Sequence, residues 1–181
     1  MNSIQRPSKR FALLFRVLFF LYPIGVLAVW LVADPGTGGQ WLELDAFKRA
    51  GLFSADPPLG TWQRLACFGA AMLPGAAVMY AYRSLWRLFD LYAAGAFFEQ
   101  ENVACFRDIG WALMAQQILT LPAGALQTLA LTAHNPEGER MVTLAIEDSN
   151  VTLVVVGLMI ILISKVMDEG RKLQEEQRLT V

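Results

Sequence analysis

Four stretches of the sequence are long and apolar, and they constrain the fold more than any other feature does. About 20 mostly apolar residues are needed to cross a hydrocarbon layer roughly 30 Å thick. Residues 65–82 and 109–133 contain no charged side chain, and residues 11–33 contain only Arg16. Residues 151–166 form the shortest and most aliphatic stretch. The pattern predicts an all-α membrane protein with four transmembrane helices in a bundle.

The composition also favours a lipid environment. Hydrophobic residues make up 55% of the 181-residue chain and charged residues only 17%, whereas soluble domains carry about 25% charged residues. The length suits a single membrane domain over residues 1–181, of which residues 167–181 form a tail that is expected to be helical to about Gln177. The net charge is −1, so we expect no direct contact with nucleic acid.

The first apolar stretch has one feature of a signal peptide, because Arg6, Lys9 and Arg10 precede it. The hydrophobic core of a signal peptide is roughly 7 to 15 residues long, and its cleavage site favours a small residue where this chain has Leu31. The stretch is longer than such a core. We therefore expect a retained membrane anchor.

The distribution of lysine and arginine predicts the orientation, because both are enriched on the cytoplasmic side of a membrane. Eleven of them lie in the N-terminal segment, in the connection between the second and third stretches, and from Lys165 onwards. The other two connections hold four, which are Lys48, Arg49, Arg64 and Arg140. We therefore expect both termini, including the tail at 167–181, in the cytoplasm.

Three glutamines lie inside the third apolar stretch. Gln116 and Gln127 are eleven positions apart, about three helical turns, so they share a helix face, and Gln117 adjoins it. An amide without a hydrogen-bonding partner is costly in lipid, so we expect this face to point into the bundle and bond to neighbouring helices. A polar path for a transported substrate is the alternative interpretation.

Prolines fall inside each of the first three stretches, at Pro23, Pro74 and Pro122. A proline removes one backbone hydrogen bond and clashes with the preceding turn, so these helices are expected to bend. The bends are either hinges or a ligand cavity, or they are the ordinary prolines of membrane helices, whose neighbours satisfy the freed groups.

The two outer connections carry weaker signals. Residues 34–64 enclose an apolar segment that begins at Trp41, which predicts a short helix in the membrane interface. Residues 142–146 alternate apolar and polar side chains as in a short strand, and Asp148 or Ser149 is suited to cap the last helix.

The inner connection is expected to continue the second helix as far as Gly95, which permits a stop and a turn. This extension would present an interfacial side made of Leu85, Trp86, Leu88, Phe89 and Tyr92.

Motifs of enzymes and cofactor-binding proteins are absent from the sequence: there is no nucleophile elbow, HExxH, phosphate-binding loop or dinucleotide fingerprint. His134 with Glu137 and Glu139 is better explained as a solvated turn than as a metal site. Cys67 and Cys105 are expected to be small packing residues. We therefore expect neither an enzyme nor a bound cofactor or metal.

Two segments carry a family resemblance, GAFFEQENVACFRDIGW before the third stretch and SKVMDEGRKLQEEQRLTV after the fourth. With Phe98, Glu101 and Asn102, the pair Gly170 and Leu173, and the Leu-Thr-Val ending, the chain resembles the uncharacterised bacterial proteins grouped as domain of unknown function family 2975. The resemblance implies a four-span inner-membrane protein. Because genes of the family often neighbour small helix-turn-helix regulators of the Cro/repressor type, it also implies such a regulator as a partner. It implies no activity, cofactor or catalytic residue.

A candidate partner surface follows from these segments, which the predicted topology brings to one side of the membrane. Its members are Phe97, Phe98, Glu101, Asn102, Gly170, Arg171, Lys172 and Leu173. Phenylalanines supply apolar anchors and the charged groups orient a partner. Alternatively, the residues pack against one another, with Phe98 under the tail and Glu101 paired with Arg171.

Three functions from different classes fit the sequence. The first is a membrane sensor or tether that holds a small cytoplasmic regulator. The second is a small transporter or channel, although no charged residue lies near mid-membrane, where ion-handling groups are expected. The third is a structural subunit of a larger membrane assembly.

Overall fold

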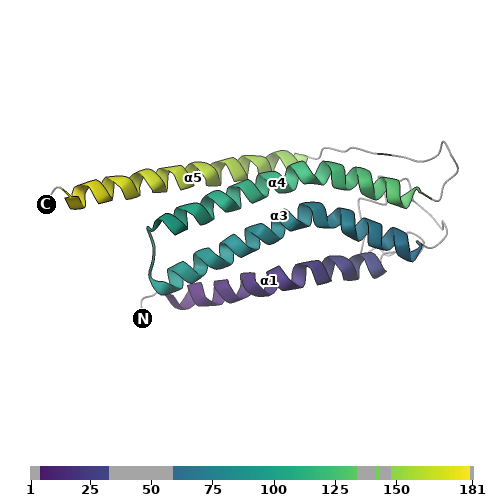
Figure 1. Ribbon diagram of the computed structural model, residues 1–181, viewed down its shortest axis with the longest axis horizontal. Helices are drawn as coiled ribbons and strands as arrows, with labels where there is room; N and C mark the ends of the chain where they lie inside the picture. Colours follow the sequence, from purple (N-terminus) through teal and green to yellow (C-terminus); the bar gives the residue numbers. More distant parts are fainter. Residues whose placement is uncertain (1–4, 33–58, 134–141, 143–147, 180–181) are drawn as a thin grey trace. The chain divides into compact units, whose positions relative to one another are not determined.

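The computed structural model describes residues 5–32, 59–133, 142 and 148–179, apart from the side chains of residues 148–150, 174 and 177–179. Within these ranges the backbone forms four α-helices (Figure 1), which are α1 (Gln5–Val32), α3 (Thr61–Ala94), α4 (Gln100–Leu131) and α5 (Asp148–Leu179). No residue in the described ranges belongs to a β-strand.

All four helices are long and apolar enough to cross a membrane. Each covers all or nearly all of one predicted apolar stretch, so the prediction of an all-α membrane protein with four such helices is confirmed. Helix α3 continues to Ala94 and α5 to Leu179, as the sequence predicted for the inner connection and the tail.

The chain divides into two compact units. Unit 1 contains Met1–Leu21, Ala76–Gln117 and Asp148–Val181, and unit 2 contains Tyr22–Gly75 and Ile118–Glu147. Helices α1, α3 and α4 therefore contribute residues to both units, whereas α5 belongs to unit 1.

The prolines inside the helices lie close to the positions where the chain passes from one unit to the other. Pro23 follows the division in α1, Pro74 precedes the division in α3, and Pro122 follows the division in α4. The bending of the helices at these prolines stays a prediction.

The core of unit 1 is made by α3 and α4. Leu88, Cys105 and Ile109 are buried together, and Leu85 and Tyr92 pack against them. The predicted interfacial side of the α3 extension is therefore wrong at these positions. These apolar side chains of α3 pack against α4, because the two helices lie against each other on either side of their connecting turn.

Helix α1 contacts α3 in unit 1 through aromatic and charged groups. The ring of Phe11 stacks on that of Phe89, with centroids 5.1 Å apart. Arg16, the one charge in the first apolar stretch, lies 4.1 Å from the ring centroid of Trp86 and 3.7 Å from a carboxylate oxygen of Asp90. A cation near apolar surroundings is stabilised by such partners.

Helices α4 and α5 approach closely in unit 1 at a pair of glycines. A Cβ atom on Gly110 would lie 2.8 Å from the carbonyl oxygen of Gly157 and 2.5 Å from a side-chain carbon of Ile161. A Cβ atom on Gly157 would lie 3.0 Å from the carbonyl oxygen of Gly110. Small residues at such a contact let two membrane helices pack backbone to backbone.

The core of unit 2 joins α1, α3 and α4. Trp30, Cys67 and Leu131 are buried in one cluster with Leu59 and Ala130. Both cysteines are free and buried, Cys67 here and Cys105 in the core of unit 1, so the prediction that they are packing residues agrees with the structure.

The first turn of α3 satisfies backbone groups at the ends of two other helices in unit 2. The guanidinium of Arg64 donates to the carbonyl oxygens of Trp30 (3.2 Å) and Leu31 (2.6 Å) at the end of α1. The side-chain amide of Gln63 donates to the carbonyl oxygens of Ala130 (3.3 Å) and Leu131 (3.4 Å) at the end of α4. These carbonyls have no partner within their own helices, so the two side chains cap them.

The three glutamines of α4 are buried to different degrees. Gln117 is the buried glutamine, at 6% exposure, whereas Gln116 and Gln127 are only partly buried. The hydrogen bonding of the Gln116 and Gln127 face to neighbouring helices stays a prediction, as does the alternative of a polar path.

Large apolar side chains are exposed along the helices, such as Phe20 and Ile24 on α1 and Leu162 and Val166 on α5. Monomeric soluble proteins rarely expose contiguous apolar surface to this extent. A hydrocarbon solvent explains this surface.

Several sequence predictions fall on residues outside the described ranges. These are the interfacial helix near Trp41, the strand at 142–146 apart from Val142, the turn with His134, Glu137 and Glu139, and the capping side chain of Asp148 or Ser149. The backbone of α5 begins at Asp148.

Candidate functional site

The connection between α3 and α4 is a tightly hydrogen-bonded turn in unit 1. Gly95 has a φ angle of +90°, a conformation that favours glycine. Its N–H donates to the carbonyl of Tyr92 (3.1 Å), and the N–H of Ala96 donates to the carbonyl of Leu91 (3.0 Å). This pair of bonds is the Schellman motif, which ends a helix at a glycine. The predicted stop at Gly95 is therefore confirmed.

The side chain of Asn102 hydrogen-bonds the first turn of α4 to this connection. Its side chain is fully buried, and Nδ2 donates to the carbonyl oxygen of Ala96 at 2.9 Å. Its backbone N–H donates to the carbonyl of Glu99 at 3.0 Å, which starts the helix. The Oδ1 atom of Asn102 is buried without a hydrogen-bonding partner. A buried amide bonded on one side fixes the turn and makes its position sensitive to substitution.

The charged segment of α5 forms its own ion pairs. Arg171 pairs with Asp168 at 3.2 Å and with Glu175 at 2.6 Å, and Lys172 pairs with Asp168 at 2.9 Å. The Nε atom of Arg171 is buried and has no hydrogen-bonding partner. Two carboxylates therefore hold the guanidinium in place while one of its donors stays unused.

A pocket of about 520 Å³ lies where the turn meets this segment of α5. Its lining is formed by Gly95, Ala96, Phe97, Phe98, Glu99, Gln100, Arg171 and Glu175. The ring of Phe97 stacks on Tyr92, with centroids 5.7 Å apart, so its position is fixed by the core of the unit. Phe98 is 68% exposed at the pocket. An apolar anchor thus stands beside a guanidinium and a carboxylate.

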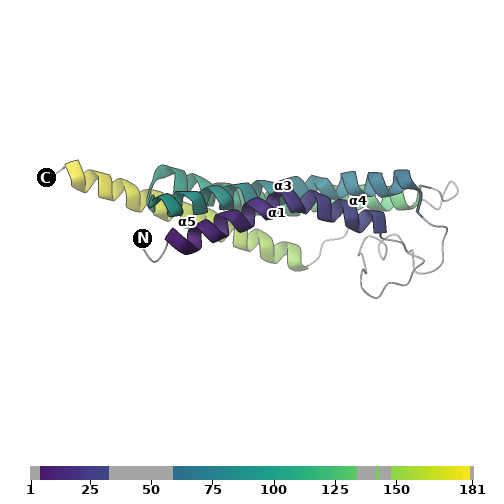
Figure 2. The same ribbon diagram turned by 90° about the horizontal axis from the view of Figure 1, so that it is seen from below.

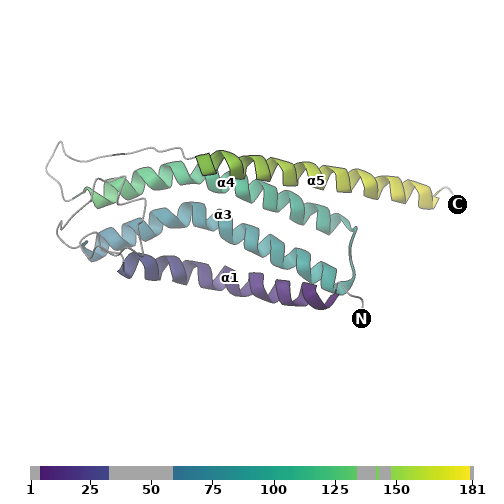
Figure 3. The same cartoon turned by 180° about the vertical axis from the view of Figure 1, so that it is seen from behind.

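Helix α5 extends beyond this turn. In Figure 2 and Figure 3, as in Figure 1, its C-terminal end continues past the connection between α3 and α4. The pocket is therefore bordered on one side by the turn and on the other by α5.

The structure brings together only part of the predicted partner surface. Phe97, Phe98 and Arg171 line one pocket, whereas Gly170, Lys172 and Leu173 on the same helix do not line it. Asn102 is buried and supports the turn from within, so it offers no surface to a partner.

The alternative in which the predicted residues pack against one another is wrong in its contacts. Glu101 pairs with Arg87 at 3.1 Å, and Arg171 pairs with carboxylates of its own helix. Phe98 is exposed and does not lie under the tail. The reason is geometric: α4 starts immediately after the turn and packs against α3, which places Glu101 beside Arg87.

Sequence reasoning missed the polar members of the pocket, Glu99, Gln100 and Glu175. Glu175 follows Arg171 by one helical turn, so the i, i+4 pairing rule would have found it. Among the described residues, no group of three or more His, Cys, Asp or Glu side chains is arranged to hold a metal ion. The arrangement suits recognition of another molecule through one apolar anchor and charged hydrogen bonds.

Comparison with known proteins identifies a family. The family described as protein of unknown function (DUF2975) matches residues 50–181, a range that includes α3, α4 and α5 and the whole pocket and begins after α1. No curated protein and no solved structure matches the chain.

Proposed function

The chain belongs to the DUF2975 family of proteins of unknown function, and on that premise we propose that it is a membrane tether or sensor that holds a small cytoplasmic regulator at the pocket beside the α3–α4 turn. The proposed partner is a small helix-turn-helix DNA-binding protein, and the nucleic acid contacts belong to that partner. The observation that carries the proposal is the pocket itself, which combines exposed Phe98 with Arg171.

The pocket has properties expected of a docking site. The residues that line it are held in place without a partner. The Schellman motif and Asn102 fix the turn, and two carboxylates fix the guanidinium of Arg171. A preformed site loses little conformational entropy on binding. Exposed Phe98 supplies the apolar contact that dominates many interfaces.

The proposed location is the bacterial inner membrane, with both termini in the cytoplasm. The support is the bias of lysine and arginine, which are enriched around the α3–α4 turn, at the N-terminus and in α5. This orientation directs the pocket to the side on which a DNA-binding protein is found. The proposed role is binding rather than catalysis.

The test is a binding measurement with the full chain in lipid nanodiscs and the purified regulator encoded beside its gene. Phe98→Asp removes the apolar anchor and should weaken binding by about tenfold or more, and Arg171→Gln should do the same, because a hydrogen bond to a charged group contributes ~1.5–3 kcal/mol. Titration by fluorescence anisotropy measures both effects.

The matched control for Arg171→Gln is Lys172→Gln. Lys172 is the next residue on α5, carries the same charge and also pairs with Asp168, but it does not line the pocket. Equal loss of affinity in both variants would indicate a general charge effect and contradict the pocket. A chain that binds no regulator but co-purifies with another membrane protein would instead identify a subunit of an assembly.

A further inference from the structure

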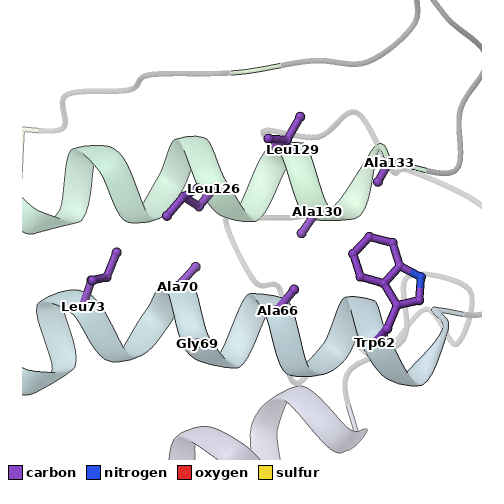
Figure 4. Close-up of a pocket in the computed structure, with 9 residues that line it drawn as sticks. All are labelled: Trp62, Ala66, Gly69, Ala70, Leu73, Leu126, Leu129, Ala130 and Ala133. Atoms are coloured by element: carbon purple, nitrogen blue, oxygen red, sulfur yellow. The ribbon is translucent and has the colours of Figure 1, made fainter.

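A pocket of about 610 Å³ lies within unit 2, between the first part of α3 and the last part of α4 (Figure 4). Its lining consists of Trp62 and of alanine, glycine and leucine side chains, none of which carries a charge. Ligand sites orient and select a ligand with a few polar groups at fixed positions. Charged groups at fixed positions lie instead in unit 1, on an exposed face that α3 and α4 share.

Two contacts between side chains join α3 to α4 on this face. The guanidinium of Arg87 pairs with the carboxylate of Glu101 at 3.1 Å, and the hydroxyl of Tyr80 donates a hydrogen bond to the carboxylate of Asp108. On each helix the two contacts are seven positions apart, which is about two helical turns. Because α3 and α4 pack against each other on either side of a short turn, the two contacts define which of their residues face each other.

Arg83 lies between these two contacts and has no carboxylate opposite it. It comes three positions after Tyr80 and four before Arg87, and its side chain is exposed. The position of α4 that corresponds to Arg83 is Ala104, three positions after Glu101. A methyl group cannot neutralise a guanidinium, and it leaves open the space that a carboxylate takes at the contacts on either side.

Arg107 adds a second cation beside this position. Its side chain is exposed and, like that of Arg83, interacts electrostatically with the hydroxyl group of Tyr80. Neither arginine forms an ion pair with a carboxylate in the part of the chain that the structure describes. Asp108 carries one negative charge against the two positive charges of the arginines, so the group has one positive charge in excess.

The two arginines lie where α3 and α4 leave the apolar layer. Arg83 directly follows the uncharged stretch 65–82, and Arg107 precedes the stretch 109–133 by two positions. Trp111, one helical turn after Arg107, is 57% exposed. Tryptophan is enriched at the level of lipid headgroups. We therefore expect the two guanidinium groups at the depth of the lipid phosphates.

We propose that Arg83 and Arg107 bind the phosphate of an anionic phospholipid, which supplies the negative charge that Ala104 lacks. Guanidinium groups match phosphate oxygens in geometry, and basic sites between membrane helices bind anionic headgroups. A zwitterionic headgroup carries its own cation beside its phosphate, so the excess positive charge favours phosphatidylglycerol over phosphatidylcholine. We expect a preference of about tenfold.

The experiment uses the full chain in nanodiscs of phosphatidylcholine that contain a small fraction of a photoreactive lipid. This lipid is either phosphatidylglycerol or phosphatidylcholine, with the same diazirine beside its glycerol backbone. After photolysis, mass spectrometry measures the labelling of residues 80–87 and 101–111 by each lipid. Phosphatidylglycerol should label these segments about tenfold more than phosphatidylcholine. A smaller preference is expected at residues 161–169, around exposed Lys165 on α5.

Ala104→Glu and Ala104→Gln form a matched pair that tests the missing carboxylate. Ala104→Glu places a carboxylate opposite Arg83, so the chain supplies the anion itself and the preference for phosphatidylglycerol should disappear. Ala104→Gln adds a side chain of the same length and similar helix propensity but no charge. It should retain most of the preference.

Arg83→Gln and Lys165→Gln form a second pair, and each removes one exposed cation at the end of an apolar stretch. Only Arg83→Gln should lower the preference at residues 80–87 and 101–111, by about tenfold. Arg83 has no ion pair to lose, so the thermal unfolding of Arg83→Gln without added lipid should match that of the parent chain. This variant keeps the proposal testable even where Ala104→Glu disturbs the fold.

Equal labelling by the two lipids would overturn the proposal, and so would a preference that survives Ala104→Glu. Equal losses in Arg83→Gln and Lys165→Gln would show a general effect of surface charge and would also contradict it. Soluble glycerol phosphate, added in excess, should leave the labelling unchanged, whereas displacement of the lipid would identify a site for a soluble anion instead. Arg83 and Arg107 do not line the partner pocket, so the result does not depend on the proposed function.

Discussion

Asn102 is a buried polar residue, and its substitution should report on the turn beside the pocket. Asn102→Ala leaves the carbonyl of Ala96 without its 2.9 Å bond, but it also removes the unpaired Oδ1 atom. We expect a net loss of about 1 kcal/mol in the free energy of unfolding. Asn102→Asp should lower the free energy of unfolding more than Asn102→Ala does, because a carboxylate cannot donate to the carbonyl of Ala96 and its charge would be buried there. Thermal unfolding in detergent measures both.

The control for these variants is the neighbouring Glu101→Gln. Its ion pair with Arg87 is exposed, and exposed pairs contribute only about 0–1 kcal/mol. If Asn102→Asp were as stable as the parent chain, the buried amide would not be holding the turn as described.

At the scale of helices, the contact between α4 and α5 depends on Gly110. Gly110→Ala places a methyl group 2.8 Å from the carbonyl of Gly157 and 2.5 Å from Ile161, so the helices must separate. Overpacking of this kind costs about 1–3 kcal/mol. Gly170→Ala on α5 is the matched change, since its added Cβ meets nothing described within 4 Å and alanine favours the helix by up to ~1 kcal/mol. Opposite shifts in melting temperature are expected, and shifts of the same sign would argue against the glycine contact.

The first turn of α3 is the other helix-scale contact that can be tested. Gln63 accepts from the N–H of Gly60 at 2.8 Å and donates to the end of α4. Gln63→Ala should lower stability by about 1–2 kcal/mol and speed amide exchange at the start of α3. Hydrogen–deuterium exchange with mass spectrometry measures this locally. Gln100→Ala, at an exposed glutamine that starts α4, should leave exchange around Gly60 unchanged.

At the scale of the whole molecule, the basic residues predict that both termini and the α3–α4 turn face the cytoplasm, while Trp41 and His134 face outward. Single cysteines introduced at these positions, after replacement of Cys67 and Cys105, can be labelled from either side of intact cells. Position 134 should react with an impermeant reagent added outside. Labelling of position 134 only after the cells are opened would reverse the assignment.

The helices themselves were predictable because each contains a long stretch with few or no charges, and only helices of that length satisfy their own backbone in lipid. The stop at Gly95 was predictable for a similar reason, since the local sequence alone determines a Schellman ending. These features depend on residues that are close together in the chain.

Pairings between helices were not predictable in the same way. The sequence suggested Arg171 as the partner of Glu101, but the partner is Arg87. That choice depends on how α3 and α4 are rotated about their axes, which no spacing within one helix reveals. The burial of Asn102 was missed because a polar residue beside charged ones looks exposed, whereas its bond to Ala96 turns it inward.

The capping of α1 by Arg64 has a consequence for the order in which the chain assembles during synthesis. Translation delivers α1 first, and its last carbonyls reach the membrane boundary before the residue that binds them has been made. Arg64 follows Leu31 by 33 positions and lies in the first turn of α3. Its guanidinium can therefore bind the last carbonyls of α1 as soon as α3 begins to form. The hydrogen bond of Gln63 forms later, because its acceptor at the end of α4, Ala130, lies 67 positions further along the chain. Two adjacent residues would thus act in sequence: Arg64 would join α3 to the end of α1, and Gln63 would then join it to the end of α4.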